Sequence, residues 1–439
     1  MAKSSALPKS IPFIIGNEAA ERFSFYGMKA ILTTFLVSQF YNPAGDPALQ
    51  ATAEAKANEI THLFNTLVYF LPIGGALIAD WFWGKYKTIL YLSLVYCCGH
   101  LFLSVFENNI NGFLSGLLLI AIGAGGIKPC VSANVGDQLQ GKDETLISKA
   151  FSWFYFSINV GSFIAILLMP IIRYNTTPAI AFAIPGILMA IATIIFFSGR
   201  KMYVRVPPTG VKNVNFLKGL KSIWRILVFF ALVPIFWALN DQNSSEWVLQ
   251  AQKLDLHFLG HTWLAEQIQS LNPILVLAFI PLFNYGLFPL IRKMGIDFTP
   301  YRKIGTGFIL TIISFLVIYW IQLQIDAGHK PNVGWQCIAY VIITAGEVLV
   351  YQTGLEYAYT QSPPGMKSTI MSFWLLTISL GNYIVSAVNS SIASGGLFKG
   401  MEGASFYLFF TILMTITTAI YFILINTVLK KKPDHMNTD

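Results

Sequence analysis

The sequence predicts an all-α integral membrane protein whose twelve transmembrane helices form two six-helix bundles. Hydrophobic residues make up 55% of the 439 residues, charged residues make up only 11%, and the mean hydropathy is +0.59. Soluble domains carry roughly 25% charged residues. The apolar residues also gather in closely spaced runs of about 20 residues, the length that a helix needs to cross a bilayer. Composition and run length together exclude a soluble globular protein.

Twelve such runs follow one another along the chain, each long enough for a helix that crosses with some tilt. The predicted spans are 11–40, 58–81, 87–106, 112–138, 149–173, 178–199, 223–243, 270–294, 302–325, 334–361, 367–394 and 403–429. The segment "MAKSSALPKS" leads directly into a charged helix, so we do not expect a cleavable signal peptide.

The distribution of lysine and arginine predicts which side of the membrane each loop faces. With the N-terminus inside, the cytoplasmic ends and loops carry 21 of the 29 basic residues, the external loops carry five, and three lie within spans. Because basic residues favour the cytoplasmic side, both termini are expected in the cytoplasm. The same asymmetry accounts for the net charge of +8, so no nucleic-acid partner is expected.

The longest cytoplasmic connection divides the spans six and six. It contains Pro207 and Pro208 together with seven basic residues, a composition typical of a linker beside anionic lipid headgroups. We therefore predict an N-terminal six-helix bundle at 1–199, a cytoplasmic linker at 200–222 and a C-terminal six-helix bundle at 223–439. Two such halves are the plan of a rocker-type secondary transporter.

The first span carries four charged residues. At 100° per residue, Glu18, Arg22, Phe25 and Lys29 fall on one helix face, with Glu21 about 60° to one side. Glu18 and Arg22, four residues apart, can form an ion pair. A midspan charge costs roughly 2.5–3.5 kcal/mol even on lenient scales, so we expect this face to contact protein or water. The alternative is a neutralised cluster that only fixes helix packing, which small residues would achieve at less cost.

Two further charges lie inside later spans. Lys128 in the fourth span precedes Pro129 and needs a carboxylate partner, for which Glu18 and Glu21 are the candidates. Glu356 in the tenth span has no basic residue on its own helix. Cations on the N-terminal half and a spare carboxylate on the C-terminal half would complement a zwitterion.

Other polar and aromatic residues are weaker candidates. His62 in the second span titrates near physiological pH, although a lone histidine is more often a packing residue. Asp241 ends the seventh span. Five aromatic residues lie far from the span ends, where an aromatic belt at the membrane interface would not place them: Tyr26, Tyr69, Tyr155, Trp237 and Trp374. They are candidate site residues, and ordinary core packing is the alternative. The four cysteines show no metal-ligand spacing.

Several motifs resemble the proton-dependent oligopeptide transporter (POT/PTR) family of the major facilitator superfamily. "GGALIADWFWGKYKT" resembles the cytoplasmic loop signature of the superfamily, and "EAAERFSFYG" resembles the E-x-x-E-R-F-x-Y-Y-G signature of the family. "GGIKPCVSANVGDQ", "FSWFYFSINVGS", "FWALNDQ" and "TAGEVLVYQTGLEYAYTQSP" look like its fourth, fifth, seventh and tenth spans. The match runs in order along nearly the whole chain and implies the major facilitator fold.

The resemblance also implies roles for individual residues. The proton-coupling residues would be Glu18, Glu21, Arg22, Lys128, His62 and Asp241. The peptide-binding residues would be Lys29, Lys128, Tyr26, Tyr69, Tyr155, Asn159, Trp237, Asn272, Glu356, Thr360 and Trp374. Arg225 would be a gate residue. No cofactor or metal is implied, protons being the coupling ion, and no obligate protein partner is evident.

Three residues depart from the family pattern. Phe25 stands where the signature prefers tyrosine, and Lys29 stands where many members have arginine, which replaces a bidentate fork by a point charge. Asn284 occupies the position of the acidic partner of Arg225, which argues against that ion pair. The segment "IDAGHKPNVG" is too short for the extracellular domain of some relatives. The chain therefore resembles the compact bacterial members, which implies a location in the bacterial inner membrane.

We expect a proton-coupled symporter that imports di- and tripeptides by alternating access in the plasma membrane. Within the family, the alternative is another anion or an amino-acid conjugate, but nitrate would leave Glu356 without an ammonium partner. A channel would favour a continuous polar lining, and a sensor would carry a soluble output domain. An enzyme is not expected, because no nucleophile–base or metal constellation is present in the sequence.

Overall fold

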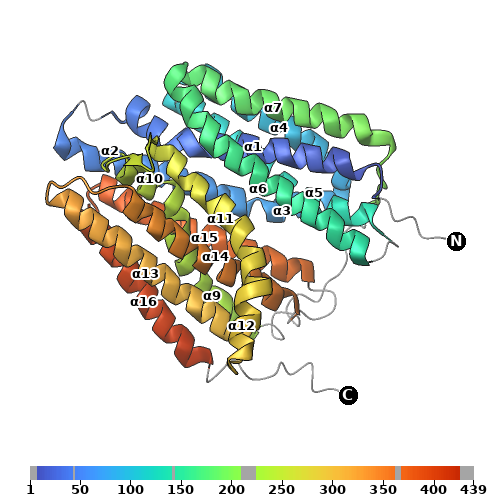
Figure 1. Cartoon of the computed structure of the whole chain (residues 1–439). Helices are drawn as coiled ribbons and strands as arrows, with labels where there is room; N and C mark the ends of the chain where they lie inside the picture. Colours follow the sequence, from blue (N-terminus) through green and yellow to red (C-terminus); the bar gives the residue numbers. More distant parts are fainter. Residues whose placement is uncertain (1–6, 43–44, 141–143, 209–223, 361–366, 426–439) are drawn as a thin grey trace. The chain divides into compact units, whose positions relative to one another are not determined.

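The computed structural model describes residues 7–42, 45–140, 144–208, 224–360 and 367–425, and the structural statements below concern these residues. Almost all of them lie in helices (Figure 1). The chain forms two compact units. The first unit comprises Met1–Phe40 and Leu67–Lys212, and the second unit comprises Tyr41–Thr66 and Asn213–Asp439.

The first unit is built from long helices. They are α1 (Ile11–Phe35) with the π-helical η1 (Leu36–Phe40), α3 (Pro72–Ile78) with η2 (Ala79–Trp83), α4 (Lys85–Val105), α5 (Ile110–Gln138), α6 (Glu144–Asn175), α7 (Pro178–Ser198) and η3 (Gly199–Lys201). Within this unit α1 packs against α6 and α7, while α4 packs against α5 and α7. Asn109 and Thr177 cap α5 and α7 by accepting hydrogen bonds from the backbone N–H three residues on.

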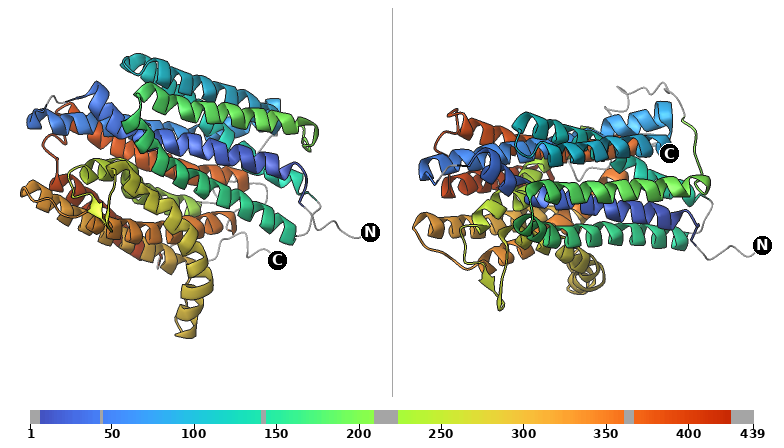
Figure 2. Two further views of the ribbon diagram at one scale, coloured as in Figure 1. Left: turned by 45° about the horizontal axis from the view of Figure 1, so that its top comes forward. Right: turned by 90° about the horizontal axis from the view of Figure 1, so that it is seen from above.

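The second unit contains the remaining helices and a small hairpin. Its elements are α9 (Trp224–Asn240), η4 (Asp241–Ser244), α10 (Glu246–Ala251), β1 (His257–Phe258), β2 (His261–Thr262), η5 (Ala265–Ser270), α11 (Leu271–Pro281), η6 (Leu282–Leu287), α12 (Phe288–Lys293), α13 (Pro300–Asp326), α14 (Gly334–Thr360), α15 (Lys367–Ala393) and α16 (Ala404–Leu424). Here α13 packs against α14 and α16, and α9 packs against α15 (Figure 1). Figure 2 shows α11 and α12 joined into one bent helix, with the π-helical η6 between them.

Each of the twelve predicted spans contains helix. Of the helices in the described ranges, ten are long and apolar enough to cross a membrane. Two predicted spans fall short of that measure for separate reasons. Helix α1 carries four charged residues, and α9 has only 17 residues, beginning next to residues 209–223, which lie outside the described ranges. Most of the predicted linker at 200–222 lies in that same stretch.

Helix α2 (Pro47–Phe70) begins eleven residues before the predicted start of the second span at residue 58. Its first part, "PALQATAEAKA", is too polar for a hydropathy pattern to detect. Residues 41–66 group with the second unit, so the two units differ from the two predicted bundles by this segment. Hydrogen bonds explain the grouping: the Ser386 hydroxyl donates to the Glu59 carbonyl at 3.0 Å, and the Ser379 hydroxyl donates to the Thr66 carbonyl at 2.8 Å.

Glycines allow α3 and α5 to approach closely, as the Gly-rich sequence predicts. A Cβ added at Gly75 would overlap with the backbone of Gly126, whereas a Cβ at the neighbouring Gly74 would meet nothing within 4 Å. The chain then turns sharply at Gly84, whose φ of 73° lies in the left-handed region that favours glycine. Directly after this turn, the Lys85 ammonium pairs with Asp137 of α5 at 2.7 Å.

The two adjacent glycines make a matched pair for a packing test. Gly75→Ala should lower the free energy of unfolding by about 1–3 kcal/mol, because the added methyl group forces α3 away from α5. Gly74→Ala should leave the thermal unfolding midpoint of the detergent-solubilised protein unchanged or slightly higher. Equal midpoints for the two variants would contradict the close approach.

Candidate functional site

The charged residues of α1 form one buried cluster. Arg22 Nε lies 2.7 Å from Glu18 Oε1 and 2.9 Å from Glu21 Oε2. The exposed fractions are 2% for Glu18, 0% for Glu21 and 8% for Arg22, so this face contacts protein. Lys29, two turns further along the helix, is also buried. The ion pair predicted from the four-residue spacing is confirmed.

Glu21 is the least satisfied member of this cluster. In the described part of the chain, neither of its carboxylate oxygens accepts a hydrogen bond, and its only ion-pair contact is with Arg22. A fully buried carboxylate without hydrogen-bond donors is costly to keep ionised. Glu21 is therefore a group that can bind a proton, while Glu18 holds the guanidinium in place through a hydrogen bond of 2.7 Å.

Lys128 of α5 contacts aromatic rings. Its ammonium lies 4.2 Å from the ring centroid of Tyr69 and 4.6 Å from that of Phe25. No carboxylate of the described residues lies within 4.0 Å of this ammonium, in contrast to the pair with Glu18 or Glu21 that we expected. Cation–π contacts of this kind stabilise a desolvated ammonium by about 2 kcal/mol, and they leave the charge open to an anion.

Two more predicted binding residues of the first unit lie on α6. The Asn159 amide donates to the Tyr155 carbonyl one turn earlier at 2.9 Å, which holds this side chain against its own helix. Tyr155 itself is 37% exposed within the structure. On α1, the Tyr26 ring packs edge-on against Phe25 with centroids 5.3 Å apart. Of the predicted aromatic residues, Tyr26 therefore packs against Phe25, and Tyr69 contacts the same Lys128 ammonium as Phe25 does.

The predicted tryptophans of the second unit belong to one aromatic cluster. The ring centroids of Trp237 and Trp374 are 6.4 Å apart, and Tyr351 lies 6.0 Å from Trp237 and 6.2 Å from Trp374. Both indole N–H groups are buried and lack a hydrogen-bond acceptor among the described residues. An aromatic cluster with buried and unused N–H donors can offer both an apolar surface and hydrogen bonds to a bound group.

The other predicted residues of this unit lie on α11, α14 and α9. The Asn272 amide donates to Glu347 Oε2 at 2.6 Å and to the Thr344 hydroxyl at 3.2 Å. Glu356 lies on α14, nine residues after Glu347, and its side chain is exposed within the structure. Arg225 of α9 and Thr360 of α14 lie in helices, but their side chains lie outside the described part of the structure.

His62 is the centre of a buried hydrogen-bond network in the second unit. Its Nε2 lies 3.0 Å from Glu246 Oε2 and 2.8 Å from the Ser245 hydroxyl. Its Nδ1 lies 2.8 Å from Asn382 Oδ1. The amide of Asn382 donates in turn to Asp241 Oδ2 at 2.6 Å. The two titratable residues predicted from sequence, His62 and Asp241, are therefore joined through Asn382.

The orientation of the Asn382 amide shows where His62 carries a proton. Because the amide nitrogen donates to Asp241 and to the Ile378 carbonyl, its oxygen is the atom that faces the imidazole. This oxygen is an acceptor, so His62 Nδ1 must be the donor. In a neutral imidazole Nε2 is then an acceptor, and the Ser245 hydroxyl at 2.8 Å can donate to it. A second proton on the ring would instead let Nε2 donate to Glu246 Oε2 at 3.0 Å. His62 and Glu246 thus form a site that can bind an exchangeable proton.

Three residues of this network were not predicted from the sequence: Glu246, Asn382 and Ser245. Glu246 follows Asp241 by five residues in "NDQNSSEW", a polar stretch at the end of the seventh span in which nothing distinguished it from a loop residue. The 184 residues that separate Glu246 from His62 left no local pattern to join them.

The chain matches the PTR2 family model, described as the POT family, over residues 86–216 and 209–400. It is 37% identical over 423 residues to Solute carrier family 15 member 2 of Mus musculus, in an alignment that covers 84% of this chain and 56% of the mouse protein. The chain therefore spans about half the length of the curated relatives it matches.

Two solved structures match nearly the whole chain. The crystal structure of the POT family transporter PepTSo has a TM-score of 0.88 and 37% sequence identity, and the match covers 97% of this chain and 99% of that chain. An auto-inhibited POT family peptide transporter has a TM-score of 0.89 and 34% identity over 98% and 99% of the two chains. The predicted all-helical, twelve-helix membrane fold is confirmed. In this fold, and with these buried ion pairs, the chain belongs to the POT family of membrane transporters.

Proposed function

We propose that this protein is a proton-coupled symporter that imports di- and tripeptides by alternating access. The observation that carries the proposal is Glu21, a fully buried carboxylate beside Arg22 whose oxygens accept no hydrogen bond from the described residues. A proton that binds to Glu21 neutralises its buried negative charge, so Glu21 then attracts the nearby cations less strongly. Family membership and the likeness to an auto-inhibited POT family peptide transporter support a peptide as the cargo.

The cations of the first unit are suited to a peptide carboxylate. Lys128 is held by the rings of Phe25 and Tyr69, without a carboxylate of the described residues within 4.0 Å, so a substrate anion can approach its ammonium. Lys29 would share this role. In the proposed cycle, protonation of Glu21 removes a negative charge that competes at longer range with the peptide carboxylate for Lys128, and loss of that proton on the inner side releases the peptide.

The second unit is suited to the rest of the peptide. Glu356 would bind the peptide ammonium, Asn272 would bind the backbone, and Thr360 would lie nearby. Asn159 of the first unit would also bind the backbone. Trp237 and Trp374 would line a side-chain pocket of this unit. The tyrosines of the first unit, Tyr26, Tyr69 and Tyr155, would also contact peptide side chains. Charges anchor the termini, whereas aromatic surfaces contact the side chains without specific hydrogen bonds. Broad specificity follows, because discrimination requires dedicated contacts or clashes.

Proton uptake has a second candidate site at His62 and Glu246. The pair is buried, and its two atoms are 3.0 Å apart, close enough to share a proton. Asn382 connects it to Asp241, so a change of charge at the imidazole is felt at that carboxylate. We assign the proton-coupling role to this network together with the α1 cluster, and we keep Arg225 as a proposed gate residue.

The placement of basic residues supports a definite orientation in the membrane. Both termini would lie in the cytoplasm, and the protein would reside in the plasma membrane, which in a bacterium is the inner membrane. The membrane potential would then drive import, since each net positive charge that enters gains about 2.3 kcal/mol per 100 mV.

Uptake by proteoliposomes tests the function directly. The purified protein should accumulate dialanine against its gradient when the outside is acidic, and a protonophore should abolish this accumulation. Lys128→Ala should reduce uphill accumulation to the background of empty liposomes, because the cation that responds to Glu21 is missing. Lys399→Ala, which removes an exposed lysine of the α15–α16 loop, is the matched control. Unimpaired uphill transport by Lys128→Ala would refute the switching role.

The pH dependence of uptake tests the His62 network. Glu246→Gln keeps the shape of the side chain but cannot bind a proton. We expect this variant to lose most of the increase in dialanine uptake on external acidification. The exchange of external for internal peptide should continue when the pH is the same on both sides of the membrane. Asp297→Asn removes an exposed carboxylate from the same unit and should behave like the wild type. A wild-type pH profile in Glu246→Gln would remove this pair from the coupling mechanism.

A comparison of substrates tests the ammonium site. Glu356→Gln should weaken the uptake of dialanine by roughly tenfold or more, the loss expected for a charge-assisted hydrogen bond. N-acetyl-dialanine lacks the ammonium group, so its weaker uptake should change little in the same variant. Equal losses for the two substrates, measured as kcat/KM, would show that Glu356 does not bind the peptide N-terminus.

A further inference from the structure

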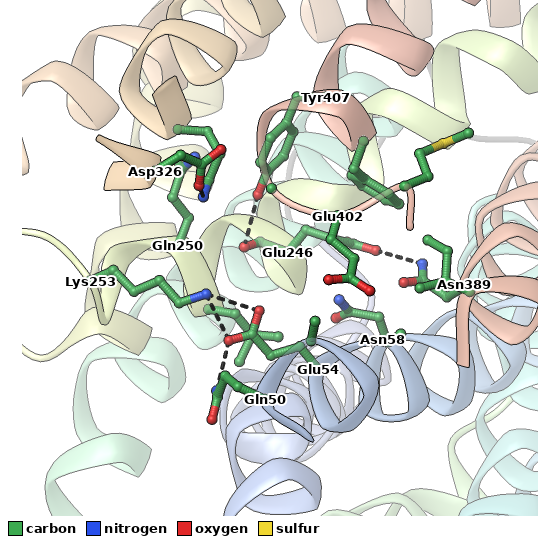
Figure 3. Close-up of a pocket in the computed structure, with 18 residues that line it drawn as sticks. Gln50, Glu54, Asn58, Glu246, Gln250, Lys253, Asp326, Asn389, Glu402 and Tyr407 are labelled. Carbon is green, nitrogen blue, oxygen red and sulfur yellow. Dashed lines mark hydrogen bonds and ion pairs between the residues drawn. The ribbon is translucent and has the colours of Figure 1, made fainter. Parts of the chain in front are cut away.

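The second unit contains a cavity of about 360 Å³ that the proposed peptide site does not use (Figure 3). It lies between the first turns of α2, the short helix α10, the end of α13, the end of α15 and the segment before α16. All of its lining residues belong to this one unit. Pockets of roughly 300–1,000 Å³ hold small organic ligands.

Negative charge dominates the lining of this cavity. Four carboxylate residues contribute to it, Glu54, Glu246, Asp326 and Glu402, and Lys253 is the one basic residue among the lining residues. Lys253 pairs with Glu54 at 2.8 Å and is thereby neutralised. Figure 3 shows the Glu402 carboxylate in the space between the other labelled side chains. Among the described residues, no basic side chain forms an ion pair with Glu402.

A second and independent feature points to a ligand that donates hydrogen bonds. Asn58 is only 4% exposed, lines the cavity and has a carbonyl oxygen, Oδ1, without a donor among the described residues. A buried acceptor left unpaired is costly, so the site is complete only when an occupant supplies an N–H or O–H group. Asp326, in contrast, is satisfied by Gln322 at 2.8 Å and by the backbone N–H of Ala404 at 2.9 Å.

The rest of the wall is apolar. Leu249, Ile392, Met401 and Phe406 line the same cavity. From the excess of carboxylates, the unpaired acceptor on Asn58 and this apolar wall, we propose that the cavity binds a small organic ammonium ion that carries an apolar group. The ammonium would donate to Asn58 and Glu402 near Glu246, and the apolar group would contact Phe406 and its neighbours.

The same features disfavour other occupants. A peptide would bring a carboxylate into a lining whose one lysine is already paired with Glu54. A bare metal ion would need several ligands at close range, and in the described ranges no group of three or more His, Cys, Asp or Glu residues could hold one. Water could donate to Asn58 but would leave the apolar wall unused, and it is the outcome against which the experiment is designed.

Glu246 connects this cavity to the His62 network. Its Oε1 accepts from the Asn389 amide at 3.1 Å, and its Oε2 faces His62. An ammonium ion in the cavity would place a second positive charge beside the carboxylate that stabilises a protonated His62. The charged and titratable side chains around Glu246 are His62, Tyr407 and those of the cavity lining, Glu54, Lys253, Asp326 and Glu402. Asp241 acts on the same His62 through its charge. Amine and proton are therefore expected to oppose each other.

Binding of benzylamine to the purified protein tests the proposal, with benzyl alcohol as the uncharged compound of the same shape. Benzylamine should bind measurably by isothermal titration calorimetry and raise the thermal unfolding midpoint, whereas benzyl alcohol should do neither. Glu402→Gln and Asn58→Leu should each weaken binding by about tenfold, as the loss of a charge-assisted hydrogen bond predicts. Asp297→Asn, which removes an exposed carboxylate outside the cavity, should bind benzylamine like the wild type.

A transport measurement separates this cavity from the peptide site. External benzylamine should inhibit dialanine uptake less as the outside becomes more acidic, and an excess of dialanine should not displace it in the binding assay. Displacement by dialanine would place the amine in the peptide site. Equal binding of benzyl alcohol would show an apolar cavity only, and no binding of benzylamine would leave a cavity filled by water. Each of these three results overturns the proposal.

Discussion

The cost of burying charge is the constraint on which the rest of this structure depends. A membrane helix with four charged side chains is stable only if protein groups replace the water that those side chains lose. In α1 this replacement is local, because Glu18 and Arg22 lie one turn apart and Glu21 is adjacent to Arg22. Arg22 thus pairs with both carboxylates, and this group of three keeps one net negative charge when all are ionised. Lys128 does not join this ion pairing and lies over the rings of Phe25 and Tyr69 instead.

The two units satisfy this constraint in different ways. The first unit uses ion pairs within one helix and aromatic rings on its neighbours. The second unit uses amide side chains between helices, with Asn382 joining His62 to Asp241, and Asn389 holding Glu246. Amides can donate and accept at the same time, so they transmit a change of protonation without carrying charge themselves. Glu246 belongs both to this network and to the acidic cavity, which connects proton binding with the proposed amine site.

Buried acceptors without a hydrogen-bond donor are the feature that makes these groups useful to a transporter. A pair whose hydrogen bonds are all satisfied stabilises one state, whereas Glu21 and Asn58 each keep an acceptor without a donor among the described residues. A proton or a ligand that completes such a group changes the energy of the state in which it binds. Transport requires this kind of differential stabilisation, because a ligand that binds both states equally shifts no population.

The sequence alone determined the features that depend on local periodicity. Apolar run length predicted helix in all twelve spans, and a spacing of four residues predicted the Glu18–Arg22 pair. The tertiary structure decided which side chains from distant segments meet. His62 and Glu246 are 184 residues apart, the polar start of α2 is held by α15, and Lys128 lies over two rings instead of a carboxylate. Such contacts depend on the rotation and register of packed helices, and no repeat within a single helix encodes these two quantities.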